Sequence, residues 1–182
     1  MKSKLLMTAV AVLALGSLTA ACTPTRTTKS AGEAVDDSVI TAKVKTDLAR
    51  DPKTSAYKIE VETFRGDVQL NGFVESAEMK TAATGVARSV KGVKKVENNL
   101  RIGGDRSAGE VVDDAVITTK VKTALAADPV VAAHEVNVQT HEGVVMLAGF
   151  VDTGAQKSKA TEVTKGVGGV RQVDNQLEVK QR

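Results

Sequence analysis

The sequence predicts an α+β protein made of two tandem domains, each with the element order helix, strand, strand, helix, strand. Residues 30–102 and 107–179 align without a gap and are identical at 37 of 73 paired positions. Within each copy, the spacing of apolar residues changes from a helical period to a period of two. A unit of about 70 residues is too long for a solenoid turn and sufficient for a small domain.

A helix is predicted at the start of each copy. In the first copy Val39, Ile40, Val44 and Leu48 recur at helical spacing. Asp36 or Asp37 is expected to accept hydrogen bonds from the free amide groups of the first turn. The Asp-Pro pair that follows should end the helix, because the residue before proline avoids helical geometry. The equivalent residues of the second copy are Val116, Ile117, Val121, Leu125, Asp113 and Asp114.

The rest of each copy is predicted to be a β-hairpin, a second helix and a last strand. Alternation from Ile59 to Thr63, the dipeptide Arg65-Gly66 and alternation from Val68 to Val74 indicate two strands joined by a tight turn. The second helix is expected at 77–90, and the last strand from 93 or 96 to 102. Both helices should cover one face of a three-stranded mixed sheet. In the second copy the turn falls at 142–143, the helix at 155–167 and the last strand from 170 or 173 to 179.

The N-terminal residues have the features of an export signal. Two lysines precede an apolar stretch at 5–18, which is shorter than the ~20 residues needed to span a membrane. Small residues lead to Cys22, the only cysteine of the chain. This pattern resembles a bacterial lipoprotein signal, in which the cysteine is acylated, as with palmitate, and becomes the mature N-terminus. Thr23 is not the aspartate associated with inner-membrane retention, so we expect a lipid-anchored, periplasm-facing protein of the outer membrane. A soluble periplasmic protein with an ordinary secretory signal is the alternative.

The repeated unit also resembles a known family. The order of its elements, together with GDVQLNGFV at 66–74 and GVKKVENNL at 92–100, is similar to the BON domain of bacterial osmotic-stress and nodulation proteins. The resemblance implies an envelope protein with two such domains, linked to osmotic tolerance and membrane integrity, for which phospholipid binding is proposed. The expected organisation is a signal peptide at 1–21, a flexible tether at 22–32, domain 1 at 33–102, a linker at 103–109 and domain 2 at 110–180.

Few residues in the chain suggest catalysis. His134 and His141, the only histidines, align with Tyr57 and Phe64 and are expected on opposite faces of one strand. Neither the histidines nor the aspartate pairs form a metal set or a catalytic dyad, and no phosphate-binding loop is present. We therefore expect no enzyme activity, no metal and no cofactor. Without the signal, 23 basic and 22 acidic side chains leave a net charge of +1, which gives no support to nucleic-acid binding.

The sheet face without helices differs between the copies. In domain 1 its central strand carries polar residues and ends in Phe73, which predicts a solvated strand. In domain 2 the same face carries an apolar stripe, which a monomer rarely leaves in water. We expect domain 1 or a separate partner to cover this stripe. Its residues, the interface candidates, are Val144, Met146, Ala148 and Phe150.

Two sets of basic residues are candidates for contact with phospholipid headgroups. One lies around the end of the second helix of domain 1 and consists of Arg88, Lys91, Lys94 and Lys95. The other, Lys120 and Lys122, lies on the first helix of domain 2. Stabilisation of a helix C-terminus and ordinary amphipathic packing are the structural alternatives for the two sets. The sequence therefore favours an envelope lipoprotein that binds phospholipid headgroups, with a module that docks a periplasmic partner through the apolar stripe as the second hypothesis.

Overall fold

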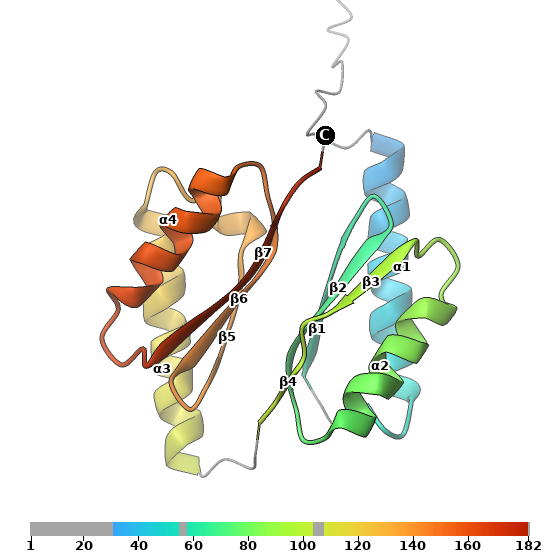
Figure 1. Ribbon diagram of the computed structural model, residues 1–182, viewed down its shortest axis with the longest axis horizontal. Coiled ribbons are helices and arrows are strands. Elements are labelled where there is room, and N and C mark those ends of the chain that lie inside the picture. The colour runs from blue at the N-terminus through green and yellow to red at the C-terminus, as the bar shows by residue number, and fades with distance from the viewer. Residues whose placement is uncertain (1–30, 55–57, 104–107, 182) are drawn as a thin grey trace, which may run out of the picture.

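The predicted element order occurs twice in the computed structural model, which describes residues 31–54, 58–103 and 108–181. Two sheets face each other at the centre, and a pair of helices covers the outer side of each sheet (Figure 1). Domain 1 contains α1 (Ala31–Arg50), β1 (Ile59–Phe64), β2 (Asp67–Val74), α2 (Ala77–Ser89), β3 (Lys95–Asn98) and β4 (Arg101–Ile102). Domain 2 contains α3 (Ala108–Ala127), the 3-10 turn η1 (Ala133–Glu135), β5 (Asn137–His141), β6 (Val144–Val151), α4 (Gly154–Lys165) and β7 (Gln172–Val179).

The sheet of each domain is mixed, as predicted. β2 is the central strand of domain 1 and pairs antiparallel with β1 and parallel with β3 and β4. β6 has the same position in domain 2, antiparallel to β5 and parallel to β7. The last strand of domain 1 is interrupted at Asn99 and Leu100, although the amide of Asn99 still donates to the Leu70 carbonyl at 2.8 Å.

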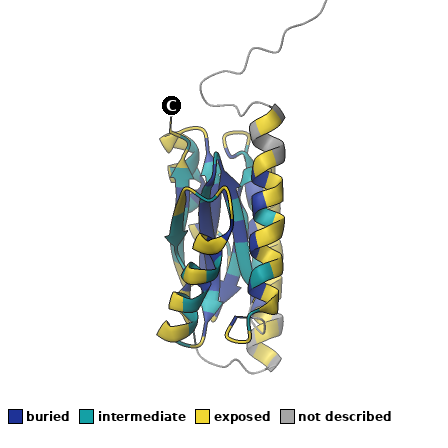
Figure 2. Ribbon diagram, turned by 90° about the vertical axis from the view of Figure 1, so that its right-hand side faces the viewer, coloured by how far each residue is buried: buried dark blue, intermediate teal, exposed yellow. Residues whose placement is uncertain are grey.

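Each domain has its own hydrophobic core between its helices and its sheet. The predicted helical stripe is buried against β1 and β2 from Ile40 to Leu48, and in the same way from Ile117 to Leu125 in domain 2. Val39 and Val116, which were predicted to begin the two stripes, are instead 63% and 46% exposed. The opposite sides of the helices are exposed, as Figure 2 shows for domain 1. Helix α1 ends one residue before Asp51-Pro52, which confirms the predicted stop.

The prediction that the paired aspartates accept from the first turn of the helix is wrong. Helix α1 begins at Ala31, so Asp37 lies well inside it, where the free amides of the first turn are out of reach. Its buried carboxylate instead accepts hydrogen bonds from the amides of Arg65 (2.7 Å) and Gly66 (2.9 Å) in the β1–β2 turn. In domain 2, Asp114 binds the amides of Glu142 and Gly143, both at 2.9 Å.

These hydrogen bonds explain a strained turn in each hairpin. Arg65 and Gly66 both have positive φ, at 53° and 87°, as a type I′ turn requires. A positive φ is unfavourable for arginine, and the turn leaves two amides pointing toward the helix. The aspartate carboxylate binds both amides and so holds the hairpin to the first helix of its own domain.

Two domain boundaries differ slightly from the prediction. Residues 31–32, expected in the tether, belong to α1, and residues 108–109, expected in the linker, belong to α3. Neither segment contains the proline that would interrupt a helix, and the helix that carries the apolar stripe extends through each of them. The predicted signal peptide and the rest of the tether, including Cys22, lie outside the described residues.

Candidate functional site

The helix-free faces of the two sheets pack against each other and bury the apolar stripe of domain 2. Met146 and Ala148 are 1% and 2% exposed, and Val144 and Phe150 are partly buried. Domain 1 therefore covers this face. The sequence had left open whether domain 1 or a separate partner does so. A separate partner could reach the stripe only if the two sheets separated.

The same contact buries the face of β2 that the sequence predicts to be solvated, so that prediction is wrong. Gln69 and Asn71 are 0% and 1% exposed. Oε1 of Gln69 accepts a hydrogen bond from the amide of Gly149 at 3.1 Å, and its Nε2 donates to the carbonyl of Gln176 at 3.4 Å. The buried amide of Gln69 is tolerated because its polar atoms find backbone partners in the other domain. Polar residue type alone did not reveal this, since the partners come from the second copy.

Two stacked ring pairs cross the interface. The rings of Phe64 and Phe150 have centroids 5.4 Å apart, and those of Phe73 and His141 are 4.7 Å apart. His141 occupies in domain 2 the position of Phe64 in domain 1, and Phe150 occupies that of Phe73. The two pairs are therefore related by an approximate two-fold axis. Each aromatic pair contributes about 0.5–1.5 kcal/mol beyond its buried area.

Polar contacts also cross the interface. Nδ2 of Asn137 donates to Oε1 of Glu62 at 3.2 Å. Nε of Arg101 lies 3.1 Å from Oδ2 of Asp174, and the carboxylate is largely shielded from solvent. The sequence did not predict these residues as interface residues, because the partner of each one lies in the other copy.

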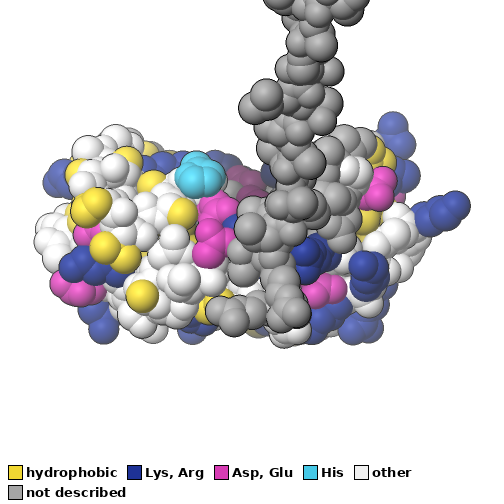
Figure 3. Space-filling view, turned by 90° about the horizontal axis from the view of Figure 1, so that it is seen from above, with side chains coloured by type: hydrophobic (Ala, Val, Ile, Leu, Met, Phe, Trp, Pro, Cys, Tyr) yellow, Lys and Arg dark blue, Asp and Glu magenta, His cyan; other side chains and the backbone are white. Residues whose placement is uncertain are grey.

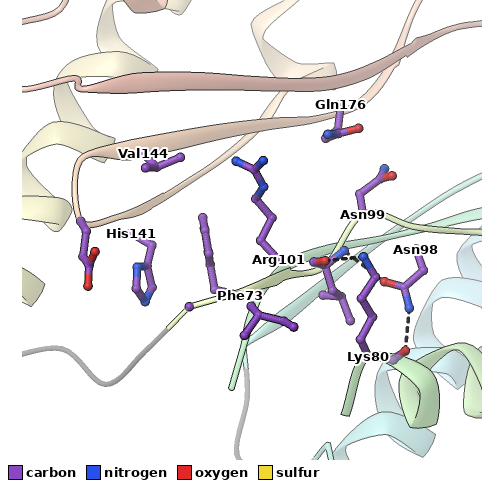
Figure 4. Close-up of a pocket in the computed structure, with 12 residues that line it drawn as sticks. Phe73, Lys80, Asn98, Asn99, Arg101, His141, Val144 and Gln176 are labelled. Atoms are coloured by element: carbon purple, nitrogen blue, oxygen red, sulfur yellow. Dashed lines mark hydrogen bonds between the residues drawn. The ribbon is translucent and has the colours of Figure 1, made fainter. Parts of the chain in front are cut away.

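A cleft of about 680 Å³ opens beside the Phe73–His141 pair. Figure 4 shows residues of both domains pointing into it, with Lys80 and Arg101 from domain 1 and Gln176 from domain 2. Both cations are already engaged: Nζ of Lys80 donates to the Leu100 carbonyl at 2.7 Å, and Arg101 pairs with Asp174. The cleft is thus a polar groove between the domains, and both of its cations are engaged by other groups of the protein.

The basic set of domain 1 is partly committed to structure. All four residues are exposed at the α2–β3 corner. Nζ of Lys94 donates to the Arg65 carbonyl at 2.7 Å, which ties this corner to the hairpin turn. Lys95 forms an ion pair with Glu97, which raises the pKa of Lys95. Arg88 and Lys91 form no ion pair with the residues described. Figure 3 shows Lys and Arg side chains projecting mainly from the domain 1 side of the molecule.

Lys120 and Lys122 on α3 differ from their counterparts on α1 in one respect. On α1, Lys43 pairs with Asp47 and Lys45 pairs with Glu60. The positions of these acids are occupied in domain 2 by the residues Ala124 and Asn137. Lys120 and Lys122 are exposed and form no ion pair within the described part of the chain. Domain 2 therefore has both cations but neither carboxylate.

The surroundings of these lysines are mixed in character. Val111 and Val116, on the same helix, are 45% and 46% exposed. A hollow of about 480 Å³ next to Lys120 is lined by Arg171 but also by the acids Asp113 and Glu142. The hollow itself therefore has no preference for an anion. The two basic sets lie on different domains, with α2 and α3 on opposite outer sides of the molecule (Figure 1), so they form two separate surfaces.

The histidines do not form a site together. His134 is exposed in η1, whereas His141 is buried at the end of β5 against Phe73. Among residues 31–54, 58–103 and 108–181, no group of three or more His, Cys, Asp or Glu side chains is arranged to hold a metal ion. Nor does any helix within these ranges have the length and apolar character needed to cross a bilayer.

The family model for the BON domain matches this chain twice, at residues 36–104 and 113–181. The chain belongs to the BON-domain family. It is 40% identical to osmotically-inducible protein Y of Escherichia coli over 152 residues, covering 82% of this chain and 75% of that protein. It is 34% identical to the 21 kDa hemolysin of Actinobacillus pleuropneumoniae and 32% identical to the outer membrane lipoprotein DolP of Haemophilus influenzae, covering in each case 80% of this chain and 75% of the relative.

The sequence predicts that Asp37 and Asp114 bind the start of their own helices, but both bind the hairpin turn of their domain. The sequence nevertheless contains a signal for this contact. In each copy, the two residues of an X-Gly turn follow the aspartate by 28 and 29 positions, at Arg65-Gly66 and Glu142-Gly143. A turn with positive φ at both positions exposes two amides, and a carboxylate at constant spacing in both copies is a suitable acceptor.

Proposed function

We propose that this BON-domain protein is a non-enzymatic envelope lipoprotein that supports outer-membrane integrity under osmotic stress, and that α3 contacts anionic phospholipid headgroups. The names of two relatives support the setting: one is osmotically inducible and another is an outer membrane lipoprotein. In this proposal Cys22 carries the lipid anchor, and several acyl chains at about 0.8 kcal/mol per buried methylene hold the protein at the bilayer.

Lys120 and Lys122 have no carboxylate partner among the residues that the structure describes, and this observation carries the headgroup proposal. A lysine that is paired on the protein surface must give up its partner before it binds a phosphate, whereas an unpaired lysine does not. Lys43 and Lys45 on α1 are paired with Asp47 and Glu60, so α1 is the less suitable surface although it has the same cations. Each basic residue near an anionic surface contributes about 1 kcal/mol.

Exposed valines on α3 fit the same surface. Val116 lies one helical turn before Lys120, so the two side chains project from the same face of the helix. An apolar side chain beside a cation can enter the boundary between headgroups and acyl chains while the ammonium group stays among the phosphates. The domain 1 set is the weaker candidate, because Lys94 and Lys95 already have partners within the domain.

Vesicle co-sedimentation tests the proposal with a matched pair of variants. The full chain carrying Cys22→Ser, which removes the anchor, is mixed with vesicles of phosphatidylcholine alone or with phosphatidylglycerol added. Replacing Lys120 and Lys122 by alanine is expected to weaken binding to the anionic vesicles by about thirtyfold, from about 2 kcal/mol for two cations. Replacing Lys43 and Lys45, an identical change in charge on α1, is expected to have a much smaller effect.

The dependence on ionic strength separates headgroup binding from apolar docking. Contacts between exposed charges are screened by salt, with a Debye length of about 8 Å at physiological ionic strength. Binding that persists at high salt would contradict the headgroup mechanism. Equal and negligible sedimentation with both kinds of vesicle would also contradict it. Docking of a separate partner on the apolar stripe is disfavoured, because domain 1 occupies that surface.

A further inference from the structure

The approximate two-fold axis of the interface relates an ion pair to a pair of acids. Arg101 of domain 1 pairs with Asp174 of domain 2. The position of Arg101 is equivalent to that of Glu178, and the position of Asp174 is equivalent to that of Glu97. The approximate two-fold axis therefore relates the Arg101–Asp174 ion pair at one end of the interface to two acids, Glu97 and Glu178, at the other end.

The carboxyl groups of Glu97 and Glu178 lie within hydrogen-bonding reach of each other. Both side chains are partly buried, and Oε1 of Glu178 is shielded from solvent without a donor among the described residues. Two ionised carboxylates at this separation repel each other, whereas one shared proton converts the contact into a hydrogen bond. The protonation state of the pair therefore decides whether it joins the domains or pushes them apart.

Among the described residues, no cation near the pair takes the role that Arg101 has at the other end. Lys95 attracts both acids, but it is directly paired with Glu97 and its side chain is 55% exposed. Lys180, further along the chain of domain 2, is engaged by Glu135 and Asp152. The remaining groups that face the pair or Lys95 are the Gln69 amide on β2 and the Asp67 carboxylate on β2.

Burial, followed by the hydrogen bond to Glu97, raises the pKa of Glu178 to about 7. The pKa of Glu97 is lowered by its bonds to Glu178 and Lys95. Because the pKa of Glu178 is higher in the folded protein than its ordinary value of 4.5, the folded state holds the proton more tightly than the unfolded state. This contribution to stability is fully present below pH 4.5 and is lost as the pH rises through about 7.

We infer that Glu97 and Glu178 form a proton-operated lock between the two domains, closed by a shared proton in mildly acidic conditions and loosened when both carboxylates are ionised. The lock lies beside the Phe64–Phe150 ring pair, since Glu178 is the register partner of Phe150 in the sheet. Loosening it weakens the sheet contact at the end that is opposite the Arg101–Asp174 ion pair.

The test measures thermal unfolding of the full chain in detergent from pH 5.5 to 8.5. We expect the folding equilibrium constant of the wild type to fall across this range by up to about tenfold per pH unit. Glu178→Gln supplies a neutral donor and should remove the slope. Glu178→Arg recreates the ion pair found at the other end, and should make the protein more stable than wild type at pH 8.5. Asp174→Asn is the matched control: it should destabilise at every pH and keep the wild-type slope.

A second measurement follows the ionisation of the pair directly, and its decisive result comes from the wild type. Carbon NMR of the labelled glutamate carboxyl groups should show Glu178 titrating near pH 7 in the wild type. In Glu97→Gln, where an amide donor replaces the facing acid and the burial of Glu178 stays, the pKa of Glu178 should be lower than in the wild type. Titration of Glu178 at its ordinary value in the wild type would overturn the inference. An equal pH slope in the wild type and Glu178→Gln would overturn it as well.

Discussion

The ring of Phe73 stacks on the imidazole of His141 with their centroids 4.7 Å apart, and the equivalent residues of the opposite copies, Phe150 and Phe64, form the second stacked pair. The helix-free faces of two homologous domains are thus joined around an approximate two-fold axis. Met146 and Ala148 lie within this contact and are almost completely buried. The domains should consequently stabilise each other.

Met146→Asp is expected to destabilise the whole protein. The change places a charge among buried apolar side chains and removes their packing, with a cost of about 3–5 kcal/mol. The midpoint of denaturant unfolding measures the effect. Val39→Asp introduces the same acid at a side chain that is 63% exposed and should change stability far less. If both variants unfolded at the wild-type midpoint, the sheet-to-sheet contact would not exist in solution.

Asp114→Ala should destabilise domain 2 by about 2–4 kcal/mol, because the amides of Glu142 and Gly143 then lose their buried acceptor. Asp113→Ala is the control, since Asp113 is an exposed neighbour on the same helix. Calorimetric unfolding measures both variants. Equal, small losses from the two changes would argue that the turn does not depend on the carboxylate.

Cys22→Ser is expected to release the protein from the membrane fraction. The proposed anchor is the acylated cysteine, and serine at this position offers no thiol for the lipid. Fractionation of cells expressing either form, with mass measurement of the mature N-terminus, tests this expectation. A wild-type protein that is found in the soluble fraction with an unmodified cysteine would exclude the anchor.

The sequence was sufficient for the fold of each domain because local signals specify it. Apolar periodicity defined the helices and strands, Asp-Pro ended α1, and Arg65-Gly66 defined the hairpin. What it missed depends on contacts between segments that are distant in the chain. Asp37 was assigned to the helix start because its hairpin partner lies 28 residues away.

The burial of β2 illustrates the same limit on a larger scale. Gln69 and Asn71 have the residue types of a solvated strand, and only the opposing domain provides the backbone groups that satisfy Gln69. The sequence predicts the lysines of α3 as candidates, but it does not show how they differ from the lysines of α1. The difference appears only in the structure, where Lys43 and Lys45 form ion pairs with Asp47 and Glu60.

The two-fold relation between the sheets has an evolutionary consequence. In a symmetric homodimer a single substitution alters both halves of an interface at once, so an acid that replaces an arginine appears at two places. Covalent fusion of the subunits removes this constraint and lets each side diverge alone. The fused chain can then keep an attractive contact such as Arg101–Asp174 on one side while Glu97 and Glu178 acquire a different chemistry on the other.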